Sequence, residues 1–484
     1  MKHPISKIIV VVGLPLLLGA CSTTSSIDTM SDTAASFAPV SARTSAVTAT
    51  RAVWVQSAAE ASAVSAQVSG LVRNKLIGPD VAVQVALLNN KGLQAAYADV
   101  GMSAADVWQA SLLVNPTVSV GMIGIDPVRT VEAAVVSNIL AMITRPRRVA
   151  IAEVRFRQAQ LVAAEETLRL AADTRRAWIN AVSAWETVSY YNKAQQAADA
   201  ASALAAKLGE TGAFTKTGQA REHVFYAELT GQAAEARLAA RTAKEELTRL
   251  MGLWGSDVDY RVPNALPAIP RSVAAKRAIE AEALQNRVDL EIARLALEAE
   301  ARSLGLTEAT RYLTDLELLA GVEVERESDE EGTTTTAVPT AEVEFVIPIF
   351  DTGKARMRKA ELAYMRAANL LAEKAVNIRS QARAAYDAYR STHEIARHYR
   401  NNVVPLRVKI EEESVLTYNG MITNTFELLA DTRAKINSIM LSLNAKRAFW
   451  LADVDLGTAI HGGGGSTPAG GGVVAAVADA GGGH

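Results

Sequence analysis

The stretch "LTDLELLAGVEVER" (313–326) alternates between acidic and apolar side chains, and the fold follows from this alternation. Its acidic residues all occupy odd-numbered positions: Asp315, Glu317, Glu323 and Glu325. The segment "TAEVEFVI" (340–347) repeats the pattern, because Glu342 and Glu344 alternate with apolar residues. Side chains of a β-strand point to opposite faces with a period of two. The sequence therefore predicts two strands, each with one acidic and one apolar face.

Two more strand-like segments occur earlier in the chain, "TVSVGMIGI" (117–125) and "TVEAAVVSNIL" (130–140). The four predicted strands thus fall within about 116–143 and 312–349. From these residues alone, half-buried antiparallel hairpins on a soluble domain are a sufficient explanation. Strands of about 10 residues with an apolar outer face and a polar inner face also form outer-membrane barrels. The strands leave both alternatives open.

The amino terminus has the pattern of a secretory signal. Two lysines precede an apolar run (8–20) of roughly 13 residues, whereas a membrane-spanning helix needs about 20. The residues "LGAC" (18–21) resemble a bacterial lipobox, in which the signal is cut before the cysteine. We therefore predict that residues 1–20 are a signal peptide and that Cys21 is acylated.

Cys21 is the only cysteine of the 484-residue chain, so the sequence offers no disulfide. Ser22 follows it, where an aspartate would resemble an inner-membrane retention signal, and this favours the outer membrane. Residues 21–51 are rich in Ser, Thr and Ala and are predicted to form a lipidated, flexible tether. The alternative is an ordinary signal peptide with a buried cysteine.

Export to the outer membrane constrains the strands. Four strands cannot close a barrel, because bacterial barrels begin at about eight. An open sheet in lipid would leave edge amides and carbonyls unpaired, at a cost of several kcal/mol each. If the strands lie in the membrane, the barrel must therefore be shared between chains. Two chains would supply eight strands and three would supply twelve, and the strand sequences do not determine which number of chains is correct.

The helical pattern is dominated by very long segments. From Pro146 to Gly209 there is no further proline and no glycine, which predicts a helix of roughly 95 Å beginning at Pro146. A second long helix is predicted from Lys354 to about Leu416, with a kink at Pro405. Each is followed by a turn and a returning helix, the first from Gln219 to Met251 and the second ending near Asp455.

The order of helix, strand pair, long helix, turn and returning helix occurs twice, over about 52–252 and 271–456. The turns "TGAFTKT" (211–217) and "NGMITNT" (419–425) also match residue by residue. The matching pairs are Gly212 with Gly420, Thr215 with Thr423, and Thr217 with Thr425. We interpret this as an internal duplication. The remaining residues, 457–484, are rich in Gly and Ala and are predicted to be a disordered tail.

Composition argues against several classes of function. Apolar residues make up 49% of the chain but aromatic residues only 5%, which favours long helices packed through small side chains over a compact enzyme. The formal net charge of −2 does not suggest a nucleic-acid partner. The six histidines form no HExxH or i,i+4 pair, and we find neither a Ser-His-Asp arrangement nor a phosphate-binding glycine loop. No catalytic residue, metal site or cofactor is predicted.

The mature chain resembles the TolC family of outer-membrane efflux ducts, and most closely its branch for heavy-metal and cation export. Three segments carry the resemblance, which extends over 52–456: "LLNNKGLQAAYADVGMSAADVWQASLLVNP" (87–116), "IPIFDTGKAR" (347–356) and "TYNGMITNTFELLADTRAKI" (417–436). The resemblance implies a mostly α fold with a small β part. Long antiparallel helical hairpins would form a trimeric α-barrel, and four strands per chain would join a shared transmembrane β-barrel. It also implies a periplasmic adaptor and an inner-membrane efflux transporter as partners.

The resemblance also assigns residues at the second helix turn. The family closes its periplasmic mouth with a tyrosine and an acid, which correspond to Tyr418 and Glu427. The chain departs from the family at Ala430, where a second acid can occur, and at Thr423, where an arginine can constrict the mouth. The turn residues implied to contact the adaptor are Gly212, Thr215, Gly420 and Thr423. Ordinary alternatives are a solvated Glu427, a packing role for Tyr418 and a turn-forming role for the glycines.

Together these observations predict a passive exit duct in the outer membrane that extends into the periplasm. Its lumen would carry the acids Asp315, Glu317, Glu342 and Glu344, and an acidic passage favours cations over anions. Metal cations or cationic compounds are therefore the expected cargo. The alternatives are a multidrug or type I secretion duct and a structural envelope lipoprotein that conducts nothing.

Overall fold

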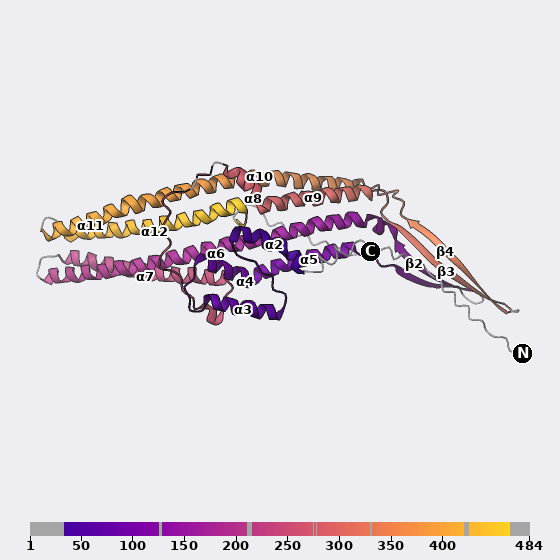
Figure 1. The fold of residues 1–484 in the computed structure, drawn as a ribbon, viewed down its shortest axis with the longest axis horizontal. Helices are drawn as coiled ribbons and strands as arrows, with labels where there is room; N and C mark the ends of the chain where they lie inside the picture. Colours follow the sequence, from indigo (N-terminus) through magenta and orange to yellow (C-terminus); the bar gives the residue numbers. More distant parts are fainter. Residues whose placement is uncertain are drawn as a thin grey trace.

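The computed structural model describes residues 33–124, 128–210, 215–273, 275–276, 278–329, 332–420 and 425–464. The molecule is elongated, with its helices running along one axis (Figure 1). The strands form one end, and the paired helix ends of two long helical hairpins form the other end. The mostly α fold with a small β part, predicted from the sequence, is confirmed.

The four strands make one antiparallel sheet in the order β1-β2-β3-β4. Their bounds are Thr117–Ile123 for β1, Val128–Asn138 for β2, Leu316–Asp329 for β3 and Gly332–Phe345 for β4. The pairing of β2 with β3 joins the two halves of the chain, because Glu132 lies opposite Glu323. Within the second hairpin, Glu317 lies opposite Glu344.

This register places the strand acids on one face of the sheet and most of its large apolar side chains on the other. Residues paired across neighbouring strands share a face, so the acids of β2, β3 and β4 gather on one side. The other side carries large apolar residues that remain exposed in the single chain: Val118, Val120, Met122, Val135, Leu318, Val322, Val343 and Phe345. The predicted amphipathic strands are therefore confirmed, and they extend to β1 and β2.

The first hairpin consists of α6 (Ile139–Glu210), a single helix of 72 residues, and α7 (Lys216–Leu250). The helix α6 begins seven residues before Pro146, the start predicted from the sequence. The Asn138 side chain accepts a hydrogen bond from the amide of Ala141 at 2.7 Å and so caps the earlier start. Near the proline, the side chains of Thr144 and Arg148 donate to helix carbonyls at 2.7 and 2.9 Å.

The second hairpin is interrupted where a kink was predicted. Its first arm is α10 (Lys354–His398), a π-helical turn η2 (Tyr399–Val403) and α11 (Val404–Asn419); its second arm is α12 (Thr425–His461). Pro405 has no N–H, and its ring would clash with the carbonyl four residues earlier, at Asn401. The wider π-helical turn contains Asn401, which accounts for the position of the interruption.

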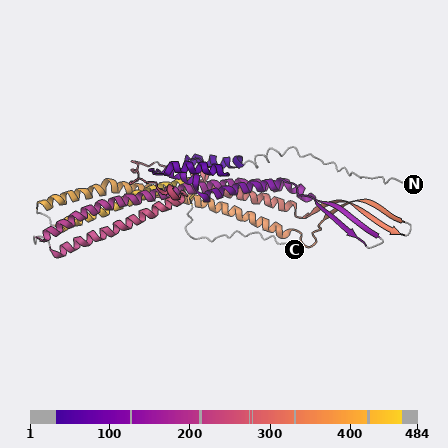
Figure 2. The ribbon, with the colours of Figure 1, turned by 90° about the horizontal axis from the view of Figure 1, so that it is seen from below.

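The shorter helices lie along the long ones, between the ends of the hairpins and the sheet (Figure 1, Figure 2). Their bounds are Thr33–Thr48 for α2, Ala58–Val72 for α3, Pro79–Asn89 for α4, Lys91–Ser111 for α5, Gly255–Val258 for the 3-10 turn η1, Ile279–Asn286 for α8 and Val288–Ala309 for α9. The hydrophobic core lies here. Several side chains without exposed surface are alanines, as the composition predicted: Ala82, Ala86, Ala181, Ala240, Ala283 and Ala382.

The structure differs from the sequence analysis at both ends of the helical body. Residues 33–48, placed in the flexible tether, form α2, because Phe37 and Val40 lie on one helix face and are buried. The ring of Phe37 meets that of Tyr97 edge-on at 4.6 Å. The carboxyl-terminal tail was predicted to begin at 457, but α12 continues to His461 because Ile460 is buried against α8 and α10. No helix in the described ranges combines the length and apolarity needed to cross a membrane.

Candidate functional site

The hairpin turns hold the residues that the resemblance assigned to the mouth and the adaptor contact. Gly212 and Thr423 lie outside the described residues. Thr215 caps α7, since its Oγ1 accepts a hydrogen bond from the amide of Gly218 at 3.0 Å. Gly420 ends α11, and its amide donates to the carbonyl of Leu416 at 3.0 Å. Thr215 and Gly420 therefore have structural roles in the turns.

The two residues assigned to the mouth flank the second turn. Tyr418, in the last turn of α11, is half-buried, and Glu427 is exposed in the first turn of α12. An acid in that position is favoured by the partial positive charge of a helix amino terminus. The structure therefore places both residues at the end of the molecule that is farthest from the sheet (Figure 1).

A contact that the sequence analysis missed joins the two hairpins near these turns. Arg433 of α12 donates from Nη2 to Oε1 of Glu222 on α7 at 3.3 Å. The guanidinium also lies 4.3 Å from the centre of the Phe225 ring. The Glu222 side chain is only 5% exposed, and this burial raises the pKa of its carboxyl, an effect that Arg433 and His223 oppose. The hairpins are therefore linked by an ion pair with a buried carboxylate and a partly exposed guanidinium.

Other polar contacts close to the turns hold each hairpin together internally. In the first hairpin, Ser202 lies 2.9 Å from His223 between Oγ and Nδ1. In the second, Lys435 pairs with Glu411, and Ser414 donates to Asp431. Asp431 follows Ala430, where the family can carry an acid, but its carboxylate is bonded within the hairpin. No spacing rule points to Glu222 and Arg433, because the partners are 211 residues apart.

The acids predicted to line a lumen lie at the opposite end, on the sheet. Glu317 and Glu344 are directly opposed, and Glu342 lies opposite Leu319 on the same face. Asp315 precedes β3 and accepts a hydrogen bond from Asn138 Nδ2 at 3.0 Å. The sequence analysis omitted Glu132, which the register places opposite Glu323. The signal was present, because Glu132 alternates with apolar residues in its own strand, but its partner depends on the β2–β3 register.

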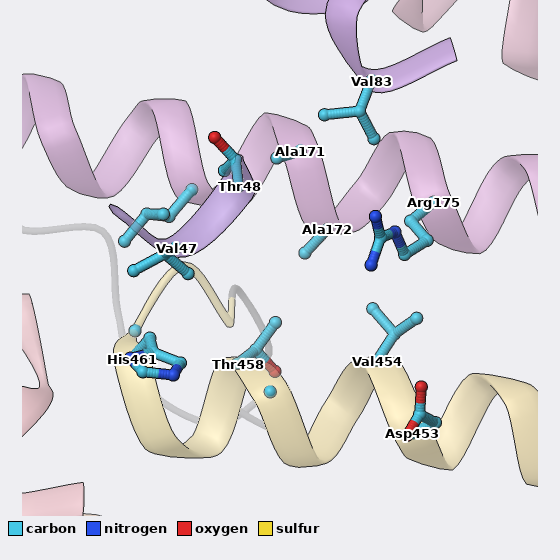
Figure 3. Close-up of a pocket in the computed structure, with 13 residues that line it drawn as sticks. Val47, Thr48, Val83, Ala171, Ala172, Arg175, Asp453, Val454, Thr458 and His461 are labelled. Carbon is cyan, nitrogen blue, oxygen red and sulfur yellow. The ribbon is translucent and has the colours of Figure 1, made fainter. Parts of the chain in front are cut away.

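A cavity of about 310 Å³ lies between α2, α4, α6 and α12 (Figure 3). Arg175 of α6 extends towards α12, whose residues Asp453, Thr458 and His461 line the opposite wall. Burial raises the pKa of the Asp453 carboxyl and lowers that of the His461 imidazole. Arg175 forms its ion pair, at 2.5 Å, with Asp80. In the described ranges, no group of three or more His, Cys, Asp or Glu residues is arranged to hold a metal ion.

Comparisons with known proteins bear on the fold as a whole. No protein-family model and no curated protein sequence matches the chain. Solved structures do match. The outer-membrane channel CmeC of Campylobacter jejuni has a TM-score of 0.67 at 15% identity, over 80% of this chain and 86% of that one. CusC, studied for folding and transmembrane channel formation, has a TM-score of 0.66 at 16% identity, over 79% and 92%.

The outer-membrane protein VceC of Vibrio cholerae is similar over 82% of this chain and 96% of its own, with a TM-score of 0.63 at 16% identity. About four fifths of this chain takes part in each of these matches. The resemblance to TolC-like ducts inferred from the sequence is therefore confirmed for the architecture. The chain has the fold of the TolC-like outer-membrane channels.

Proposed function

We propose that the protein is the outer-membrane exit duct of a tripartite efflux system and carries out no chemistry of its own. One observation carries the proposal: a single chain places an amphipathic sheet at one end and two long hairpins at the other. The solved channels share this arrangement over most of their length. In this proposal a periplasmic adaptor contacts the hairpin turns, and an inner-membrane transporter supplies the substrate.

We further propose a homotrimer. The sheet of one chain ends at β1 and β4, so each chain has two edges to be paired. Joining β4 of one chain to β1 of the next would remove the edges, and three chains of four strands would give a twelve-stranded barrel. The apolar face would then meet lipid, and the acids would line the lumen. Acylated Cys21 would add a lipid anchor in the outer membrane.

The cargo follows from the charge of the lumen. Glu132 with Glu323 and Glu317 with Glu344 place like charges side by side, which favours the passage of cations. We therefore propose metal cations or cationic compounds as substrates, in line with the resemblance to the heavy-metal branch. A multidrug or type I secretion duct is the alternative within the same fold. A non-conducting envelope lipoprotein would have no need of an acidic lumen.

At the other end, we propose that Tyr418 and Glu427 narrow the periplasmic mouth. Three copies of Glu427 around a threefold axis would form a ring of carboxylates, whose mutual repulsion a divalent cation would relieve. With Ala430 at the neighbouring position, one such ring is expected at this turn. The ion pair of Glu222 with Arg433 would hold the hairpins together in the closed mouth.

Native mass spectrometry and single-channel conductance together test the proposal. A trimer carrying acylated cysteines and conducting cations in planar bilayers is expected. Divalent cations should block the wild type more strongly than Glu427→Ala, with Glu412→Ala, an exposed acid on α11, as the matched control. A protein that forms no channel in bilayers would contradict the duct. Equal divalent block in Glu427→Ala and wild type would remove Glu427 from the mouth.

A further inference from the structure

The connector between the two halves of the chain is fastened onto the second hairpin at mid-length. His393 Nε2 lies 2.9 Å from the carbonyl of Pro270, to which it donates, because a carbonyl can only accept. Arg400 Nη1 donates to the carbonyl of Ile269 at 3.0 Å. The amide of Lys276 donates to the hydroxyl of Tyr386 at 3.0 Å. These bonds hold the connector against α10 and the π-helical turn η2.

A groove of about 940 Å³ opens between the connector, α10 and η2. Its charged lining consists of four arginines and one acid: Arg271, Arg390, Arg397, Arg400 and Glu394. Counting both histidines of the groove as neutral, four positive charges less one leave an excess of three. The carboxylate of Glu394 lies 3.8 Å from Arg390 in an exposed pair, which holds the two side chains together only weakly. We call this site the arginine groove.

Two of the arginines follow the axis of α10, and the other two come from neighbouring segments. Arg390 and Arg397 are seven residues apart on α10, which places them on one face at a spacing of roughly 10 Å. Arg271 comes from the connector on the opposite wall, and Arg400 comes from the π-helical turn. Such turns within α-helices frequently mark functional sites. The groove therefore presents guanidinium groups from three segments to one solvent-filled space.

Of the groove arginines, Arg390 pairs with Glu394, and two arginines of α10 outside the groove have acidic partners as well. Arg358 pairs with Glu361 at 3.2 Å, and Arg383 pairs with Glu280 at 2.8 Å. Within the described ranges, neither Arg271 nor Arg397 has an acidic partner. An excess of cationic groups around a concave space attracts anions and concentrates them there.

We propose that the arginine groove binds an anion carrying two or more carboxylate or phosphate groups. The planar guanidinium matches both groups through paired N–H donors, which lysine cannot reproduce. The 10 Å spacing of Arg390 and Arg397 favours a ligand whose negative groups are separated along its length. The ligand would be either a small polyvalent anion or a strand of an acidic polymer, which share this chemistry. The groove lies far from the sheet and the turns, so it adds an attachment point to the proposed duct (Figure 1).

Isothermal titration calorimetry on the purified full-length protein in detergent tests the proposal. The probes are tripolyphosphate, tricarballylate and poly-L-glutamate at low ionic strength, where screening is weak. Saturable binding is expected to weaken about tenfold or more for each guanidinium removed in Arg390→Gln and Arg397→Gln, because a charge-assisted hydrogen bond contributes at least that factor. Arg397→Lys should bind more weakly than wild type and more tightly than Arg397→Gln.

The matched control is Arg379→Gln, an exposed arginine on the same helix outside the groove. It should bind all three probes as the wild type does. Tighter binding of poly-L-glutamate than of tripolyphosphate would identify the ligand as a strand of an acidic polymer. Tighter binding of tripolyphosphate would identify it as a small anion. Absence of binding to wild type, or an equal loss in Arg379→Gln and Arg397→Gln, would overturn the proposal. Channel conductance of the groove variants should stay unchanged. A failure of the anion-binding proposal can therefore be distinguished from a failure of the proposed duct function.

Discussion

Single residues at mid-length show how burial sets proton affinity. Burial raises the pKa of Asp453 above its usual value of 3.8, and the nearby Arg175 only partly opposes this. The unfolded chain therefore loses this proton at lower pH than the folded protein does. The contribution of Asp453 to the free energy of unfolding falls as pH rises from about 3.8 through the raised pKa, so at neutral pH the group is destabilising.

We therefore predict that Asp453→Asn raises the unfolding temperature, and that the gain is larger at pH 8 than at pH 4. The lowered pKa of His461 means that the folded protein loses stability as the pH falls below about 6.5. The wild type and Asp453→Asn both contain His461, so this loss cancels when the two are compared. The control is Asp455→Asn, which removes an exposed partner of Arg176 and should cost about 0–1 kcal/mol. Thermal unfolding of Asp453→Asn below that of wild type at pH 8 would contradict the argument.

A different kind of buried charge stabilises the junction of α8 and α9. Arg287 donates two hydrogen bonds to Asp289, at 2.8 and 2.7 Å, and both side chains are nearly inaccessible. Lys374 approaches the same carboxylate at 3.2 Å. Burial alone would raise the pKa of Asp289, but the hydrogen bonds and charges of Arg287 and Lys374 outweigh it and lower the pKa. The contrast with Asp453 shows that partners decide the sign of the shift.

At the scale of elements, the strands have two chemically opposite faces. Val343 lies opposite Leu318 on the apolar face, whereas Glu344 lies opposite Glu317 on the acidic face. If the apolar face meets lipid, as we propose, the two positions should respond oppositely to a positive charge.

We predict that Val343→Lys destabilises the protein by about 2–4 kcal/mol if the position is near the bilayer midplane. Glu344→Lys should be tolerated, and it should shift the reversal potential towards anion selectivity. Denaturant unfolding from lipid vesicles measures the first effect, and bilayer recording under a salt gradient measures the second. Equal tolerance of lysine at both positions would show that the apolar face does not meet lipid.

One glycine allows the sheet to pack closely. A Cβ at Gly321 would lie 2.6 Å from the carbonyl oxygen of Ala133 on β2. A side chain at this position would therefore push β2 and β3 apart, where the two halves of the chain are joined.

At the scale of the whole molecule, the ion pair of Glu222 and Arg433 is one of the contacts that link the two hairpins near their ends. It is also incompletely satisfied, because Arg433 Nε is buried without a hydrogen-bond partner in the described part of the chain. A buried donor without a partner costs free energy, which reduces the net stabilisation that the pair contributes.

We predict that Arg433→Ala increases single-channel conductance and basal leak, because it leaves Glu222 buried without its counterion. The contact between the hairpins should lose about 1–3 kcal/mol of stabilising free energy. This is less than the loss on breaking a fully buried ion pair, because the Arg433 side chain is 39% exposed. The control is Lys435→Ala, which breaks a pair within the second hairpin. If Lys435→Ala opens the channel and Arg433→Ala does not, the link between the hairpins is not the closing contact.

Much of the architecture could be predicted from local patterns. The alternation in 313–326 and 340–347 predicted the strands and their faces, and the absence of Gly and Pro after Pro146 predicted the length of α6. Such features depend on residues that are close together in the chain, so they can be predicted from the sequence alone. The predicted start of α6 was less accurate, because the Asn138 side chain caps the helix at an earlier position than the first turn expected at Pro146.

By itself the sequence determined the element order, the two turns, the amphipathic strands and the resemblance to TolC-like ducts. Only the tertiary structure decided which distant residues meet. Glu132 with Glu323, Glu222 with Arg433, and Pro270 with His393 each join segments separated by more than a hundred residues. The physical reason is that periodicity encodes which face of an element is polar, whereas contacts across elements depend on register and packing, which no local pattern specifies.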